Sequence, residues 1–167
     1  RMAQYPVTLV VQDTTELDFT GIEIQGDGPL SYEQRTGFLD HGLVAFRPEG
    51  LCPGVHDAQI WARSDEPQLP WKQRKHDPIE TKESFRWVQM YRQACAISEE
   101  ALPTKVVMVA DSEADIYEMF VEAEKSPKFC RAEYVIRLCE NRGLPEPDEQ
   151  AGAEAFHKLF DAIADAP

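Results

Sequence analysis

The chain has 167 residues, 43% hydrophobic and 10% aromatic, so it is long and apolar enough to form a single folded domain over residues 1–167. Its formal net charge of −13 argues against a general nucleic-acid-binding surface, because proteins that neutralise many phosphates usually present a basic face. No apolar run approaches the roughly 20 residues of a membrane helix, and the four cysteines lack the Cys-x-x-Cys spacing of a zinc site. We therefore expect a cytoplasmic protein with no membrane partner.

Three predicted strands open the chain. Residues 7–12 are an apolar run that ends at Asp13. Residues 41–47 and 54–63 are two further runs, joined by a Pro- and Gly-containing connection typical of a hairpin. These three strands are expected to form an antiparallel meander. Residues 64–78 are polar and predict a long exposed loop.

Helices and strands alternate in the rest of the chain. Apolar residues at helical spacing predict a helix that is capped by Thr81. Strands are predicted at residues 105–110 and 133–138, and helices at 113–125 and 153–164. The order β-β-β-α-β-α-β-α predicts an α/β protein. Its mixed five-stranded sheet consists of an antiparallel meander followed by β-α-β-α, with helices packed on it. This is the layout of the ribonuclease H-like fold.

Two aspartates follow apolar strands in this arrangement. Asp13 comes directly after the first strand and Asp111 directly after the fourth. If these strands pair side by side, the two carboxylates lie next to each other at the edge where open α/β sheets place ligands. Each aspartate also has a simpler interpretation, because Asp13 can accept hydrogen bonds from local backbone N–H groups and Asp111 can cap the following helix.

Taken together, the two aspartates predict a metal site. Neighbouring carboxylates repel each other unless a cation lies between them. Mg²⁺ takes oxygen ligands and keeps several waters, so one or two carboxylates and a substrate phosphate suffice to bind it. Two such ions about 3.5–4 Å apart can activate a water and stabilise the leaving oxygen in phosphodiester cleavage.

Basic side chains near these positions are candidate contacts for DNA phosphates. Lys82 and Arg86 lie at the start of the predicted helix, and Arg137 and Arg142 lie around the end of the fifth strand. In the alternative interpretation the helix start is simply solvated. The two later arginines then neutralise acidic neighbours such as Glu113.

A phosphatase of the haloacid dehalogenase type is a lower alternative. Such an enzyme also begins with a strand that ends in Asp, but it has a second Asp two residues further on, where this chain has Thr15. This departure weakens the Asp-dependent phosphatase hypothesis. Thr15 is kept instead as a candidate DNA-contacting residue.

Five blocks of the sequence resemble one family when taken in order. The blocks are Asp13-Thr14-Thr15; His41 to Phe46 with Gly54 and Trp61 to Arg63; Lys82-Glu83-Ser84 with Trp87; Asp111 to Tyr117; and Tyr134 to Arg137. They resemble the DDE transposases of bacterial insertion sequences, in the branch with a Tyr-Arg-Glu-Lys signature. The resemblance runs from about Val7 to Arg142. It implies a ribonuclease H-like catalytic domain in which Asp13 and Asp111 hold Mg²⁺ or Mn²⁺ and which cleaves and transfers DNA strands.

Two departures from the family bear on activity. Ser112 stands where the family has Arg after its second acid. The family places a third acid on a later helix, beyond a β-rich insertion, and this chain has no counterpart of it. Tyr134 and Arg137 have the spacing of the signature but reach Asn141 where the signature has Glu, and they lie on a predicted strand.

The chain is therefore expected to be a truncated catalytic core. Its two ends look like cuts through a longer polypeptide, so the insertion, the third-acid helix and the DNA-end-binding and dimerisation regions of the family are expected to be absent. We expect at most weak metal binding, no catalysis, and weak or no DNA binding by this acidic fragment. Transposon ends and target DNA are expected partners of the full-length protein. The alternative is a non-catalytic, transposase-derived protein that acts by protein contacts.

Overall fold

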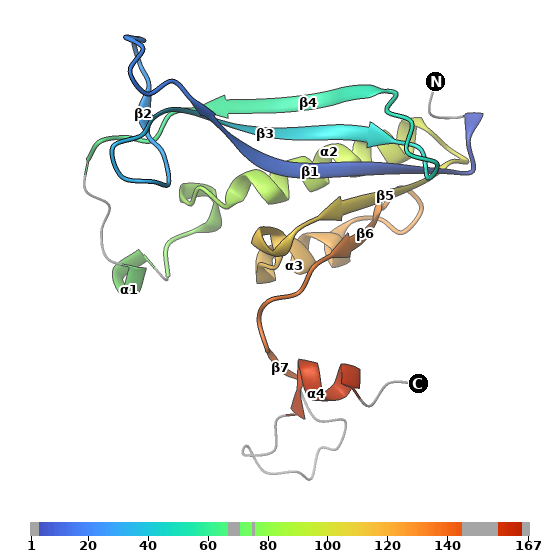
Figure 1. Ribbon diagram of the computed structural model, residues 1–167. Coiled ribbons are helices and arrows are strands. Elements are labelled where there is room, and N and C mark those ends of the chain that lie inside the picture. Colours follow the sequence, from blue (N-terminus) through green and yellow to red (C-terminus); the bar gives the residue numbers. More distant parts are fainter. Residues whose placement is uncertain (1–3, 67–70, 75, 145–156, 165–167) are drawn as a thin grey trace. The chain divides into compact units, whose positions relative to one another are not determined.

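The computed structural model of the protein describes residues 4–66, 71–74, 76–144 and 157–164. The chain divides into two compact units, Arg1–Arg137 and Leu138–Pro167 (Figure 1). The second unit contains the antiparallel pair β7 (Gly143–Leu144) and β8 (His157–Lys158), followed by helix α4 (Leu159–Ala164). Within the described ranges, no helix has the length and apolarity needed to cross a membrane.

A mixed sheet of six strands is the main element of the first unit. The strands are β1 (Val7–Asp18), β2 (Gly28–Pro29), β3 (Thr36–Phe46), β4 (Gly54–Trp61), β5 (Lys105–Ala110) and β6 (Glu133–Ile136). β3 pairs antiparallel with β1, β2 and β4, whereas β5 lies parallel to β1 and β6 lies parallel to β5. The protein is therefore α/β, with an open sheet in which an antiparallel meander precedes two parallel strands.

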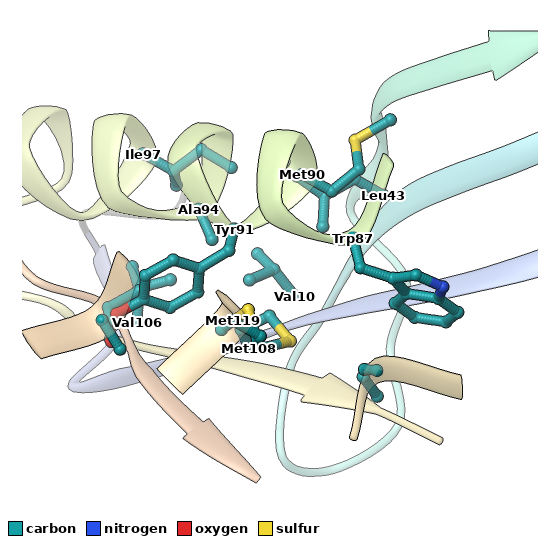
Figure 2. Close-up of a cluster of buried hydrophobic side chains, with 14 of the residues drawn as sticks. Val10, Leu43, Trp87, Met90, Tyr91, Ala94, Ile97, Val106, Met108 and Met119 are labelled. Carbon is teal, nitrogen blue, oxygen red and sulfur yellow. Dashed lines mark hydrogen bonds between the residues drawn. The ribbon is translucent and has the colours of Figure 1, made fainter. Parts of the chain in front are cut away.

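Two helices, α2 (Phe85–Glu100) and α3 (Tyr117–Lys125), pack on one face of this sheet and form the core with it. The shorter helical segments of the first unit are α1 (Trp71–Arg74), η2 (Ile79–Thr81) and η3 (Ser112–Ala114), where η marks a 3₁₀-helix. Trp87 and Tyr91 of α2 are fully buried in the same cluster as Val10, Leu43 and Met108 of the strands (Figure 2). Full burial of a side chain such as Leu43 contributes roughly 1.5–3 kcal/mol, so this cluster holds α2 firmly on β1 and β5.

The opposite face of the sheet, called the open face below, is less covered. Side chains alternate between the two faces along a strand, so Val10 and Gln12 point into the core while Val11 and Asp13 belong to the open face. Three large apolar side chains on this face are exposed by 60% or more, namely Val55, Ile60 and Val135.

β1 is longer than the sequence predicted. The prediction ended it at residue 12 with Asp13 at the strand's end, whereas β1 continues to Asp18. The eleven-residue β3 supplies partners over this length, from Leu9↔Phe46 to Asp18↔Gly37. The expectation that Asp13 terminates β1 is therefore wrong, although the pairing of β1 with β5 stops at Val11.

Both helices that follow begin later than predicted. α2 begins at Phe85, and Thr81 does not cap it, because the Thr81 Oγ1 hydroxyl donates to Pro78 O instead, at 2.8 Å. The helix predicted from residue 113 is divided in two. Asp111 caps the short η3, and α3 begins only at Tyr117.

The shorter elements differ from the prediction mainly at their ends. The five predicted strands are present, β2 adds a sixth, and the predicted loop at 64–78 contains α1. In the second unit α4 begins at Leu159 rather than at residue 153, and residues 153–156 lie outside the described residues. Phe160 and Ile163 of α4 are 40% and 52% exposed.

Candidate functional site

Asp13 of β1 and Asp111, the residue that follows β5, both lie just beyond the paired part of these two parallel strands. The last paired residues are Val11 and Val109, and each aspartate lies two residues further along its chain segment. The backbone at Asp111 is still extended, with φ −82° and ψ −167°. Because alternate residues of a strand share a face, both aspartates continue the open face begun by the two valines.

Asp13 is the more exposed of the two acids. Its Oδ1 accepts a hydrogen bond of 2.8 Å from the backbone N–H of Thr14. Together with Thr15 and Asp40 it lines a cavity of about 210 Å³ on the open face. Asp40 lies opposite Thr15 in the sheet, and its buried Oδ1 has no hydrogen-bond partner within the described residues. The cavity therefore presents two carboxylates and a hydroxyl.

Asp111 has partners on both of its carboxylate oxygens. Oδ1 accepts the backbone N–H of Glu113 at 2.9 Å and so caps η3. Oδ2 lies 3.5 Å from Nη2 of Arg137, which also donates to Ser112 Oγ at 3.3 Å. The Arg137 side chain is 71% exposed and that of Asp111 39% exposed. Exposed ion pairs of this kind contribute about 0–1 kcal/mol, so the Arg137 guanidinium is easily displaced.

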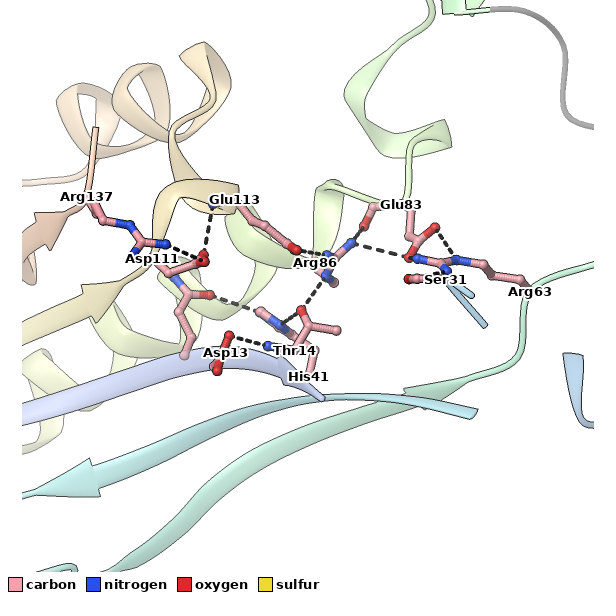
Figure 3. Close-up of polar contacts among 11 residues, drawn as sticks. Asp13, Thr14, Ser31, His41, Arg63, Glu83, Arg86, Asp111, Glu113 and Arg137 are labelled. Atoms are coloured by element: carbon pink, nitrogen blue, oxygen red, sulfur yellow. Dashed lines mark hydrogen bonds and ion pairs between the residues drawn. The ribbon is translucent and has the colours of Figure 1, made fainter. Parts of the chain in front are cut away.

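Arg86 connects three elements around the two acids (Figure 3). Its Nη2 donates to Glu113 Oε2 at 2.7 Å, its Nε to Thr14 Oγ1 at 3.1 Å, and its Nη1 to the carbonyl oxygen of Glu83 at 2.9 Å. The side chain is only 11% exposed. The guanidinium also lies over the ring of Trp61, 5.3 Å from its centre. Arg86 thus joins α2 to β1 and to η3.

A buried histidine extends this network into the core. His41 is fully buried, with Thr14 Oγ1 at 2.8 Å from Nδ1 and Gln12 Oε1 at 3.1 Å from Nε2. Burial lowers the pKa of His41 to about 4, and the nearby Arg86 cation adds to this effect. The neutral ring then donates to Gln12 and accepts from the Thr14 hydroxyl. Trp87 packs edge-on against the His41 ring, with the ring centres 4.4 Å apart.

The other predicted basic residues lie in different surroundings. Lys82 lines a groove of about 500 Å³ together with Trp61, Phe85 and Arg63. Arg63 forms a two-pronged pair with Glu83, at 2.9 and 3.1 Å. Arg142 belongs to the second unit, where its backbone carbonyl accepts the N–H of Leu159 at 2.8 Å.

The sequence interpretation missed the buried polar pair His41 and Gln12. Both stand at inward positions of their strands, where the neighbouring inward residues include Val10 and Leu43. A polar residue at an inward strand position needs a hydrogen-bond partner, because burial without one costs free energy. The alternation pattern was therefore a signal for this pair. The acids Glu113 and Asp40 were not proposed as parts of a site either.

The pair of aspartates suits a hard divalent cation. Within the described residues, no group of three or more His, Cys, Asp or Glu side chains could hold a metal ion. Asp13 is exposed and Asp111 half-buried, so both carboxylates are accessible to a hydrated ion. Mg²⁺ and similar ions bind through one or two carboxylates while keeping several waters, so the donor set of Asp13 and Asp111 fits such an ion.

No protein-family model and no curated protein sequence matches the chain.

Proposed function

We propose that this chain is part of the catalytic core of a DDE-type DNA transposase, with a ribonuclease H-like fold and with Asp13 and Asp111 as two of its metal-binding acids. The observation that carries this proposal is the parallel register of β1 and β5. Val11 pairs with Val109, and Asp13 and Asp111 each lie two residues further along the chain. The antiparallel meander that precedes the parallel strands supports the same fold.

The proposed chemistry is metal-dependent cleavage and transfer of DNA strands in the full-length protein. A divalent ion at such a site activates the attacking water or 3′-OH and stabilises the leaving oxygen. Asp13 and Asp111 would hold this ion. Arg137 lies within 3.5 Å of Asp111, so its guanidinium is close enough to contact a phosphate bound beside that acid. Thr15 and Lys82 remain candidates for contacts with the DNA backbone.

The 167-residue chain is expected to bind metal weakly and to leave DNA uncut. It supplies two of the family's three acids, and two carboxylates give a pair of ions fewer shared ligands than three do. Mg²⁺ or Mn²⁺ binding is therefore the property to measure, and cleavage activity is not a suitable readout for this chain.

A second candidate is a non-catalytic, transposase-derived protein that acts by protein contacts. Both carboxylate oxygens of Asp111 already have protein partners. The net charge of −13 also disfavours DNA as a partner. In this alternative Asp111 is only a cap for η3, and the chain has no site for a divalent ion.

A Mn²⁺ titration followed by NMR line broadening separates the two candidates. We expect the amide signals around Asp13 and Asp111 to broaden together, because a bound paramagnetic ion relaxes nearby nuclei. In Asp13→Asn and in Asp111→Asn the broadening should require at least about tenfold more Mn²⁺, since ligand removal weakens binding at least as much as loss of a supporting residue. Glu124→Gln, which changes an exposed carboxylate on α3, is the matched control. Absence of broadening at both aspartates would favour the non-catalytic protein.

A further inference from the structure

We propose that Arg86 is a positioning residue that holds Asp13 and Asp111 at the spacing a shared metal ion requires. This inference rests on the proposed function, because it concerns the same pair of acids. It gives Arg86 a role different from the DNA contact predicted from the sequence.

The contacts of Arg86 reach both acids through Thr14 and Glu113, whose backbone N–H groups the two carboxylates accept. On the β1 side, Arg86 donates to the hydroxyl of Thr14, the residue that follows Asp13 and whose N–H the Asp13 carboxylate accepts. On the β5 side, Arg86 pairs with the side chain of Glu113, whose backbone N–H is accepted by Asp111. One guanidinium therefore sets the separation of the two backbone segments that carry the acids.

The surroundings of Arg86 fix its guanidinium in this place. Its side chain is 11% exposed, and the carboxylates of Glu113 and Glu83 lie 2.7 and 3.7 Å from it. The ring centres of Trp61 and Trp87 lie 5.3 and 5.6 Å from the guanidinium carbon. Its three nitrogens serve three different acceptors, so a flexible lysine ammonium cannot reproduce the arrangement. With its side chain 11% exposed and its guanidinium in three hydrogen bonds, Arg86 is less available to a phosphate than an exposed arginine such as Arg137.

Arg137 differs from Arg86 both in the exposure of its side chain and in its contacts. Its side chain is 71% exposed, and among the described residues its ion pair is with the Asp111 carboxylate, at 3.5 Å. Both arginines place positive charge near the acids, and positive charge by itself opposes cation binding. Removal of charge alone should therefore strengthen metal binding at either position. Loss of positioning should weaken it, since residues that orient metal ligands typically contribute about 10–100-fold in affinity.

The test measures Mn²⁺ affinity by NMR line broadening and calorimetry in matched variants, with melting temperatures recorded for each. We expect Arg86→Gln to weaken Mn²⁺ binding by about tenfold or more. The signals around Asp13 and Asp111, which broaden together in the wild type, should then broaden at different Mn²⁺ concentrations. Arg137→Gln should strengthen binding. Arg92→Gln removes a different arginine of α2, paired with Glu122 at 2.7 Å, and should leave Mn²⁺ binding unchanged.

Unchanged or stronger Mn²⁺ binding in a folded Arg86→Gln variant overturns the positioning role. The proposed function still stands in that case if the wild type binds Mn²⁺ at Asp13 and Asp111. Absence of Mn²⁺ binding at Asp13 and Asp111 in the wild type overturns both. If Arg86→Gln does not fold, Thr14→Val decides, because it removes the hydroxyl that Arg86 contacts without changing any charge. Weaker Mn²⁺ binding in Thr14→Val supports the positioning role, and unchanged binding overturns it.

Discussion

At Asp111 a single side chain combines a structural role with a candidate ligand role. Its Oδ1 caps η3 while its Oδ2 points to the exposed Arg137. The cap fixes the carboxylate in one orientation, which is the condition a metal ligand needs for affinity. The two interpretations that the sequence left open for this residue are therefore compatible. A displaceable counter-ion such as Arg137 would satisfy the charge of Asp111 when no metal is bound.

His41 makes the stability of the protein depend on pH. Its pKa is lowered from 6.5 to about 4 by burial and by the Arg86 cation. As the pH falls below 6.5, the unfolded chain takes up a proton on this ring, whereas the folded protein does not until about pH 4. The unfolded state binds more protons in this window, so the free energy of unfolding decreases as the pH falls. Between pH 6.5 and about 5 the expected loss is about 2 kcal/mol, measured by urea denaturation.

The variant His41→Gln isolates this effect from the titration of other groups. It removes the ionisable ring, so its unfolding free energy should change less than that of the wild type over the same window. Equal slopes in the two proteins would contradict the prediction. If the variant does not fold, the pKa of the His41 ring can be measured in the wild type by NMR titration. A pKa near the usual 6.5 would rule out a contribution of His41 to the pH dependence of stability.

At the scale of elements, β5 and β1 show what could and could not be read from the sequence. β5 has the predicted bounds, Lys105–Ala110, because its short apolar run ends sharply at a polar residue. The far end of β1 was missed because the polar residues after Asp13 are held in a strand by pairing with β3, which is a non-local effect. The strand pattern did indicate that β1 and β5 lie side by side, and the two strands pair in parallel. The Arg86 network could not be read from this pattern, because it depends on how α2 packs on β1.

The pairing of β1 with β3 depends on a glycine in the sheet. A Cβ added at Gly37 would collide with the carbonyl oxygen of Leu17 on β1. Gly37→Ala is therefore expected to destabilise the protein by roughly 1–3 kcal/mol, the usual cost of overpacking, because the strands must separate locally. Thermal or urea unfolding measures this change.

Gly42 is the matched control on the same strand. Among the described residues, a Cβ at this position meets a methyl group of Val44 at 3.8 Å, which is an ordinary van der Waals contact. Gly42→Ala should therefore leave stability unchanged or raise it slightly, since alanine loses less backbone entropy than glycine on folding. If the two substitutions changed stability equally, the close approach of Gly37 to Leu17 would not be the cause of the destabilisation in Gly37→Ala.

At the scale of the whole molecule, the net negative charge disfavours binding of the DNA that is proposed as the substrate. The chain has 30 acidic residues and 17 lysines and arginines, while its proposed substrate is a polyanion. Most arginines near the site are also paired with carboxylates, as Arg63 is with Glu83 and Arg86 with Glu113. Because the net charge of the chain is −13, its long-range field opposes the approach of a polyanion.

This balance predicts weak DNA binding by the isolated chain even if its fold is that of a transposase core. With labelled duplex DNA at near-physiological salt, fluorescence anisotropy should give a Kd weaker than about 10⁻⁴ M, the weak end of non-specific binding, because counterion release contributes little. Mn²⁺ bound at Asp13 and Asp111 should strengthen the interaction, since it neutralises two of the acids that repel the DNA phosphates. The same addition should have a smaller effect in Asp13→Asn. Tight, strongly salt-dependent binding without metal would contradict this account, because it would require a basic surface that the net charge of −13 argues against.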